Sequence, residues 1–154
     1  EYICGMQGAV EFVYQTSFSL SDEPLYVRWL TACAKKFKAT SVDIAIAFMN
    51  DESLHKLNVK HLDHDTLTDI ITFDDSIGKD VVANIAISIE RIFANAETFS
   101  QTNEEELCRV MAHGLLHCLG YNDKNEIDKH NMEAAENICM KLFHVEHKTN
   151  NHVS

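Results

Sequence analysis

The stretch from His113 to Asp123, His-Gly-Leu-Leu-His-Cys-Leu-Gly-Tyr-Asn-Asp, constrains this chain more than any other. On a helix, His113 and His117 lie on the same side, offset by about 6 Å along the axis, so both imidazoles can reach one metal ion. Gly120 stands where a left-handed residue can end the helix and return Asp123 towards the two rings. Two histidines, one carboxylate and an open fourth position are typical of a catalytic zinc site, in which the pKa of a bound water falls to about 7.

The same helix allows a simpler interpretation. Its polar side chains Arg109, His113 and His117 form one stripe at a spacing of four, and such a stripe is also the solvated face of an amphipathic helix. Gly114 favours the metal site, because a glycine inside a helix costs about 1 kcal/mol and makes sense if a backbone or ligand must approach closely. We therefore predict that the two histidines and Asp123 bind a metal ion.

Length and composition predict one domain. A chain of 154 residues with 45% hydrophobic content can form one core and is too short for two comfortable domains. The sequence shows no signal peptide and no apolar run approaching 18 residues, so we expect a cytoplasmic protein. Five scattered cysteines without C-x-x-C spacing predict reduced thiols. Cys118 points about 100° away from the neighbouring His117 and is expected to pack in the core.

The charge of the chain bears on its partners. A formal net charge of −11 argues against a general nucleic-acid binder, which normally has a basic surface. Lysines gather at residues 35–38 and 56–60. We favour solvated helix faces as the interpretation of both groups, with a local basic groove as the alternative.

Apolar alternation predicts four strands, at residues 10–14, 42–48, 68–73 and 81–87, with a turn at 76–79 between the last two. Start signals predict five helices. They begin at Ser21–Pro24, Asn50, Ser88, the capping box Thr102–Glu105, and Glu126. In the third helix Ile92, Phe93 and Ala96 are expected to face inward. The fifth is expected to end near Phe143, with a disordered tail after about residue 147.

The residues from His113 to Asp123, preceded by Leu57-Asn58 and by the run Thr68-Asp-Ile-Ile-Thr-Phe, resemble the YbeY family of bacterial metal-dependent endoribonucleases. The resemblance spans roughly residues 40–140. It implies a single α+β domain, residues 1–154, in which a small mixed sheet of about four strands is packed by about five helices, one of them a zincin-like metal helix. It also implies one bound zinc, cleavage of single-stranded RNA, and work in ribosomal RNA maturation and ribosome quality control.

The ligand pattern is also similar to that of metzincin proteases. Those enzymes carry glutamate directly after the first histidine, and this chain has Gly114 there. A peptidase of that kind would lack its general base, so we predict no protease activity.

Three departures from the family pattern affect the expected site. Asp123 stands where the family usually has a third histidine, and a carboxylate is an accepted zinc ligand. His61-Leu62 replaces a usual Tyr-Arg pair, and Ala83-Asn84-Ile85 replaces Gly-Asp-Ile. The missing arginine removes one bidentate phosphate contact, so we expect weak RNA cleavage.

Two further residues are candidates for roles at this site. Asp69 begins the strand that the resemblance places beside the metal, and it is a candidate general base or orienting residue, with a strand-capping role equally open. Arg109 lies one turn before His113, where it contacts phosphate or, as we favour, pairs with Glu105 four residues away.

The expected partners are single-stranded RNA and ribosomal RNA or the small ribosomal subunit, with no DNA and no membrane. Zinc is the expected cofactor, although histidine and carboxylate ligands also suit nickel and iron. Two other function classes remain open at this point. One is a hydrolase of another substrate, and the other is a ribosome-assembly binding factor whose zinc does little catalysis.

Overall fold

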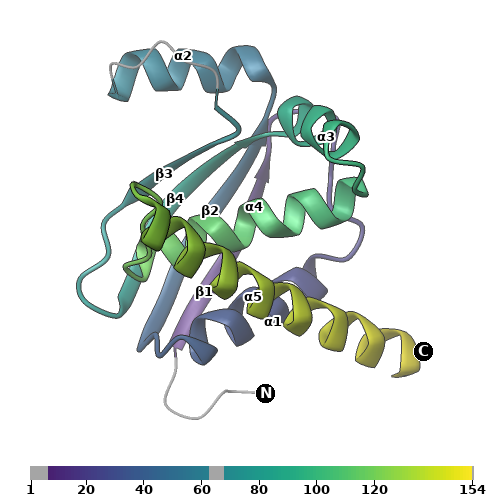
Figure 1. The fold of residues 1–154 in the computed structure, drawn as a ribbon. Coiled ribbons are helices and arrows are strands. Elements are labelled where there is room, and N and C mark those ends of the chain that lie inside the picture. The colour runs from purple at the N-terminus through teal and green to yellow at the C-terminus, as the bar shows by residue number, and fades with distance from the viewer. Residues whose placement is uncertain (1–6, 63–67, 154) are drawn as a thin grey trace.

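The fold is a single α+β domain built on one mixed sheet (Figure 1). The computed structural model describes residues 7–62 and 68–153, and the side chains of 8–60 and 68–147. The strand order is β1-β2-β4-β3. The strands are β1 (Gln7–Tyr14), β2 (Ser41–Met49), β3 (Ile70–Asp74) and β4 (Asp80–Ser88). The helices are α1 (Glu23–Lys36), α2 (Asp51–Leu62), α3 (Ile89–Thr98), α4 (Asn103–Cys118) and α5 (Glu126–Val153). The predicted α+β class, with four strands and five helices, is confirmed.

Three of the four strands are parallel. β2 pairs in parallel with both β1 and β4, and β3 pairs antiparallel with β4 at the edge of the sheet. The predicted turn between β3 and β4 is present, with Ile77 bridged to Asp80 and Gly78 in the left-handed region at φ 58°. A short turn suffices here because antiparallel neighbours can be joined directly, whereas the parallel pairs need helical crossovers.

The predicted helix starts are confirmed by their caps. The side chains of Asp22, Asn50 and Ser88 accept hydrogen bonds from backbone N–H groups three residues ahead, at 3.3, 2.8 and 3.1 Å. Thr102 and Glu105 form the predicted capping box of α4. These bonds satisfy N–H groups that have no partner within the helix, so the residues at each cap fix where the helix begins.

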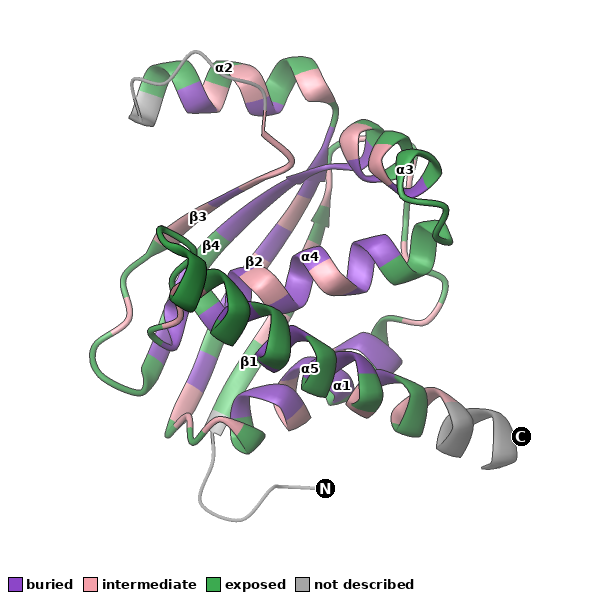
Figure 2. Ribbon diagram, in the orientation of Figure 1, coloured by how far each residue is buried: buried purple, intermediate pink, exposed green. Residues whose placement is uncertain are grey.

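The main core lies between one face of the sheet and helices α1, α3, α4 and α5 (Figure 2). Trp29 is fully buried between α1 and α5, and its indole N–H donates to the Cys139 carbonyl at 2.7 Å. On the other face, α2 packs on a smaller cluster of Met49, Leu54, Ile71 and Ala86. The main core thus holds α4 against one face of the sheet.

Two details differ from the sequence-based expectations. Phe93 is 39% exposed rather than inward, because it lies at the edge of α3 against Phe18, with ring centroids 6.1 Å apart. α5 continues to Val153, past the predicted end near Phe143. Its added turns are held by stacking of His147 on Phe143 and by an ion pair between Arg28 and Glu146 at 3.6 Å.

Within residues 7–62 and 68–153, no helix combines the length and the apolar character needed to cross a membrane. The cysteines whose side chains are described, Cys33, Cys108, Cys118 and Cys139, are all buried as free thiols. Burial, with a smaller effect of Asp74, raises the pKa of Cys118 to about 12, in agreement with the predicted packing role.

Gly114 lies where α4 packs closely on the sheet. A Cβ added at this position would lie 3.0 Å from Ile70 Cδ1 and 3.2 Å from Ile85 Cδ1. The close approach expected from the sequence is therefore made by side chains of β3 and β4. A methyl group fits here only if the isoleucine ends shift slightly, and a longer side chain would have to displace them further.

Gly114→Glu is expected to destabilise the protein by about 3 kcal/mol or more, because it places a carboxylate against two isoleucines. Gly114→Ala should leave the free energy of unfolding nearly unchanged, since a gain of about 1 kcal/mol in helix propensity offsets the cost of the tight contact. Urea unfolding of the three proteins measures both effects. A stably folded Gly114→Glu variant that digests casein would contradict both this packing and the predicted absence of protease activity.

Candidate metal centre

The end of α4 has the geometry that the sequence predicts. The N–H groups of Gly120 and Tyr121 donate to the carbonyls of His117 and Leu116, both at 3.1 Å, and Gly120 has φ 102°. Only glycine adopts this φ without strain, so the chain reverses at this residue. The reversal brings Asp123 back to α4.

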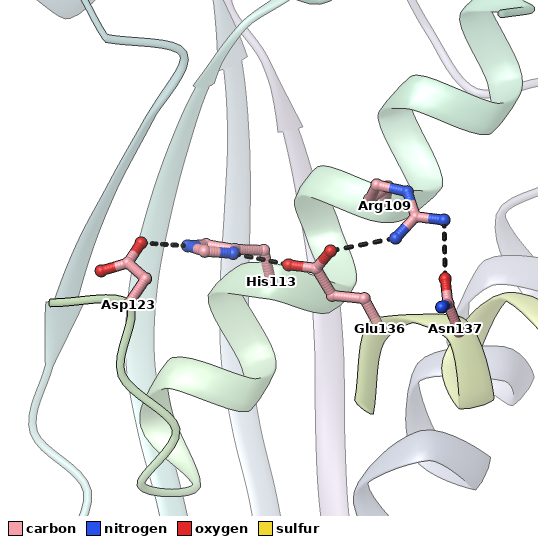
Figure 3. Close-up of polar contacts among 5 residues, drawn as sticks. All are labelled: Arg109, His113, Asp123, Glu136 and Asn137. Carbon is pink, nitrogen blue, oxygen red and sulfur yellow. Dashed lines mark hydrogen bonds and ion pairs between the residues drawn. The ribbon is translucent and has the colours of Figure 1, made fainter. Parts of the chain in front are cut away.

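Asp123 and His113 face each other across this reversal (Figure 3). The Oδ2 atom of Asp123 lies 3.5 Å from Nε2 of His113. In a tetrahedral zinc site with ligands at about 2.0–2.1 Å, two ligand atoms are about 3.3 Å apart. The observed separation therefore suits two ligands of one cation.

The second predicted histidine is not part of this pair. His117 is exposed near the end of α4. Over the described residues, no group of three or more His, Cys, Asp or Glu side chains is arranged to hold a metal ion. The structure thus brings together His113 and Asp123 but not the exposed His117.

Glu136 is a site residue that the sequence analysis missed. Its Oε2 lies 2.7 Å from Nδ1 of His113, on the side of the ring opposite Asp123 (Figure 3). Glu136 is only 8% exposed. The hydrogen bond to Glu136 raises the pKa of His113 most strongly, burial opposes it, and the charges of Glu136, Asp123 and Asp69 raise it further. A ligating histidine commonly donates its other ring N–H to a carboxylate in this way.

Arg109 has different partners from the one predicted. Its Nη1 donates to Oε1 of Glu136 and its Nη2 to Oδ1 of Asn137, both at 3.0 Å (Figure 3). The expected ion pair with Glu105 is wrong, because the Glu105 carboxylate accepts from Thr102 in the capping box. Local spacing allowed either pairing, and the capping bonds hold Glu105 at the start of the helix.

Asp69 lies close enough to the centre to interact with it electrostatically. Its carbonyl accepts from the Ser88 N–H at 3.0 Å, which fixes the start of β3 beside the end of β4. Burial raises the pKa of the Asp69 carboxyl, while a hydrogen bond from its own backbone and the charges of His113 and Arg91 oppose the shift. A raised pKa suits a general base, and the backbone hydrogen bond suits a capping role, so both predicted roles stay as proposals.

Glu106 is a second buried carboxyl beside the centre. It is 6% exposed, and burial, Asp69 and Glu136 raise its pKa, while Arg109 lowers it. A carboxyl whose folded pKa exceeds its unfolded pKa stabilises the fold at low pH, and that contribution is lost as the pH rises through the folded pKa. The ionised form therefore destabilises the protein at neutral pH.

Glu106→Gln is accordingly expected to raise the melting temperature at pH 7 by a few degrees. The gain should shrink towards zero as the pH falls to 4, where the wild-type carboxyl is itself protonated. Thermal melts of both proteins between pH 4 and 8 measure this. A gain that stays constant over this range would show that Glu106 does not titrate as described.

The structure describes only some of the other residues singled out in the sequence. The side chains of His61 and Leu62 lie outside the described residues, so the effect of the missing arginine stays a prediction. Asn84 is exposed on β4, opposite Phe73 of β3. Lys56 forms a highly exposed ion pair with Glu52 at 3.6 Å, as expected for a solvated helix face.

Comparison with known proteins assigns the family. Residues 14–144 match the family model described as "Endoribonuclease YbeY". Two proteins named "Endoribonuclease YbeY" are close relatives. The one from Flavobacterium johnsoniae is 44% identical over 89% of this chain and 99% of its own length, and the one from Flavobacterium psychrophilum is 40% identical over 88% and 97%.

The fold is also similar to a solved structure. A Thermotoga maritima protein, determined in solution, superposes with a TM-score of 0.70 at 24% identity, over 92% of this chain and 93% of its own. The family model and the two relatives cover most of the chain, including the whole of α4 and the loop that carries Asp123. This chain therefore belongs to the YbeY family of endoribonucleases, hydrolases that cleave phosphodiester bonds in RNA.

Proposed function

We propose that this protein is a zinc-dependent endoribonuclease specific for single-stranded RNA, acting in ribosomal RNA maturation and ribosome quality control. The observation that carries the proposal is the pair formed by Nε2 of His113 and the Asp123 carboxylate, 3.5 Å apart in a member of an endoribonuclease family. We place its work in the cytoplasm, with ribosomal RNA or the small ribosomal subunit as partner.

The chemistry of the donor atoms fits a cation. If Nδ1 of His113 carries the proton donated to Glu136, Nε2 of the neutral ring presents a lone pair to the Asp123 carboxylate. Two acceptors that face each other repel unless a proton or metal ion lies between them. His113, His117 and Asp123 would hold the zinc, with His117 turning its exposed ring towards the pair. Zinc bound there would polarise a phosphoryl oxygen as a Lewis acid and make water a better nucleophile at neutral pH.

The other side chains would prepare the site. Glu136, which is buried, holds the half-buried His113 ring in one orientation through their hydrogen bond. Asp69 would accept a proton near the reacting phosphate, since burial raises the pKa of its carboxyl and so makes its ionised form a stronger base. A role for Arg109 as a phosphate contact would require it to share its guanidinium with Glu136 and Asn137.

The test is cleavage of end-labelled RNA by the purified full-length chain after zinc loading. The proposal predicts internal cuts in single-stranded RNA and none in the matching duplex, in DNA of the same sequence or in casein. Asp123→Ala, purified in parallel, controls for contaminating nucleases and should lose both zinc and cleavage. Zinc-loaded wild-type protein that binds RNA without cutting it would instead identify a binding factor, and cleavage of casein a different hydrolase.

A further inference from the structure

The two carboxylate oxygens of Glu136 have separate partners, and this indicates a specific role for the residue. Its two carboxylate oxygens are used by two different residues of α4, Oε2 by His113 at 2.7 Å and Oε1 by Arg109 at 3.0 Å (Figure 3). An ionised carboxylate has only acceptor sites. A guanidinium has only donors, so the oxygen of Glu136 that meets Arg109 is also an acceptor.

This arrangement determines where the proton of His113 lies. Because Glu136 can only accept, Nδ1 of His113 must be the donor, and the neutral ring then has its lone pair on Nε2. Free histidine in water favours the opposite tautomer, with the proton on Nε2. The protein environment therefore selects the less common form, which is the one whose lone pair faces Asp123.

Arg109 is itself held by a third residue. Its second terminal nitrogen donates to Oδ1 of Asn137 at 3.0 Å, and Asn137 follows Glu136 directly on α5. The guanidinium is thus bound at two points by adjacent residues of one helix, and its side chain is 31% exposed. A guanidinium bound in this way is oriented along α5 rather than extended towards a substrate.

We propose that Glu136 is a positioning residue that fixes the Nδ1–H tautomer of His113, and that Arg109 is a second positioning residue that fixes Glu136. This inference rests on the proposed function. The Nδ1–H tautomer is useful because it leaves the lone pair of Nε2 free to bind a metal ion. Docking of α5 on α4 then prepares the centre before any ligand binds. Arg109 accordingly acts through Glu136 and not as a phosphate contact.

The chain offers a matched control for this proposal. Glu133 lies one turn before Glu136 on α5, is exposed, and lines the same surface depression of about 330 Å³ with Arg109 and Glu136. No hydrogen bond or ion pair within the described residues joins it to His113. Glu133→Gln and Glu136→Gln therefore remove the same charge from the same helix. Only the second changes the partner of His113, because the new amide turns its NH2 donor towards Nδ1 when its oxygen accepts from Arg109.

The first experiment is long-range ¹H–¹⁵N correlation NMR of the full-length, zinc-free chain with ¹⁵N-labelled histidine, at a pH where His113 is neutral. His113→Ala identifies the His113 signals. The proposal predicts the Nδ1–H tautomer in wild type and in Glu133→Gln, and loss of that preference in Glu136→Gln. An Nε2–H tautomer of His113 in the wild-type protein would overturn the proposal, whatever the variants do and whether or not they fold well.

The second experiment is zinc titration with a competing chelator. Glu136→Gln is expected to weaken zinc binding by about 10–100-fold, as when a residue that orients a ligand is lost, and Glu133→Gln to change it by less than about twofold. If the two variants lost the same amount of zinc affinity, the effect of Glu136 would come from its charge alone. That result would overturn its positioning role.

Arg109→Gln separates positioning from phosphate contact. A positioning residue predicts weaker zinc binding and an unchanged salt dependence of RNA binding in the zinc-free protein. A phosphate contact predicts intact zinc binding and a single-strand salt slope lower by about 0.7, and that pair of results would refute the role given to Arg109. The tautomer is measured without zinc or RNA, so an Nδ1–H tautomer in a protein that does not cut RNA would reject the proposed function alone.

Discussion

His113→Ala is expected to lose both the bound metal and RNA cleavage. His113 contacts both acidic residues of the centre, since Asp123 lies on one side of its ring and Glu136 on the other. If His113 ligates zinc as proposed, its removal should weaken zinc binding by more than the roughly 100-fold lost with an orienting residue. Elemental analysis after dialysis and cleavage of labelled single-stranded RNA measure the two effects.

Two variants serve as controls for this prediction. His130→Ala removes an exposed histidine of α5 and should keep full metal content and activity. Asp123→His should also keep the metal, because it restores the third ligand that is more usual in the family. If His113→Ala retained one metal ion per chain, the metal would have to bind elsewhere.

Trp29→Ala is expected to give the largest loss of stability. Its ring is fully buried, lies edge-on to Phe143 with centroids 5.2 Å apart, and donates to the Cys139 carbonyl at 2.7 Å. Truncating such a side chain costs about 3–5 kcal/mol, which for a chain of this size lowers the melting temperature by on the order of 10 °C. Urea unfolding and thermal melts measure this loss.

Trp29 also joins α1 to α5, the helix that carries Glu136. Trp29→Phe should cost less, because it keeps most of the apolar volume and loses only the hydrogen bond. Phe99→Ala, at an exposed position after α3, should change stability little. A loss in Trp29→Ala no larger than in Phe99→Ala would mean that the contact between α1 and α5 is not a central part of the core.

The local parts of the structure were predictable from sequence. Helix starts at Asn50, Ser88 and Thr102 depend on side chains that bond to backbone groups three residues ahead, so a short window of sequence contains the whole interaction. The turn at Gly120 is equally local, because only glycine readily takes its φ. These two kinds of signal also place Asp123 beside His113.

Contacts between distant residues were harder to predict. Glu136 lies on a different helix from His113, 23 residues later, and no local pattern pairs the two. A signal was available, because Glu136 stands one turn after Met132 and next to Ala135, on the side of α5 that faces the core. A carboxylate among buried positions needs a partner, so an acidic residue on that stripe indicates a nearby cation or donor.

The wrong assignment of Arg109 has a related cause. Glu105 satisfies the spacing for an ion pair with Arg109 and also the spacing for a capping box with Thr102. The capping bonds use the carboxylate, and Arg109 turns to α5 instead. Sequence spacing alone shows which pairings are possible, whereas the docking of α5 determines which one forms.

X-ray absorption at the zinc edge of the purified, zinc-loaded protein tests the proposed centre most directly. If His113, His117 and Asp123 hold the ion, the spectrum should show nitrogen and oxygen ligands around zinc at about 2.0–2.2 Å, two of them imidazoles and one from solvent. Sulfur ligands at about 2.3 Å, or a spectrum unchanged in His117→Ala, would contradict this centre.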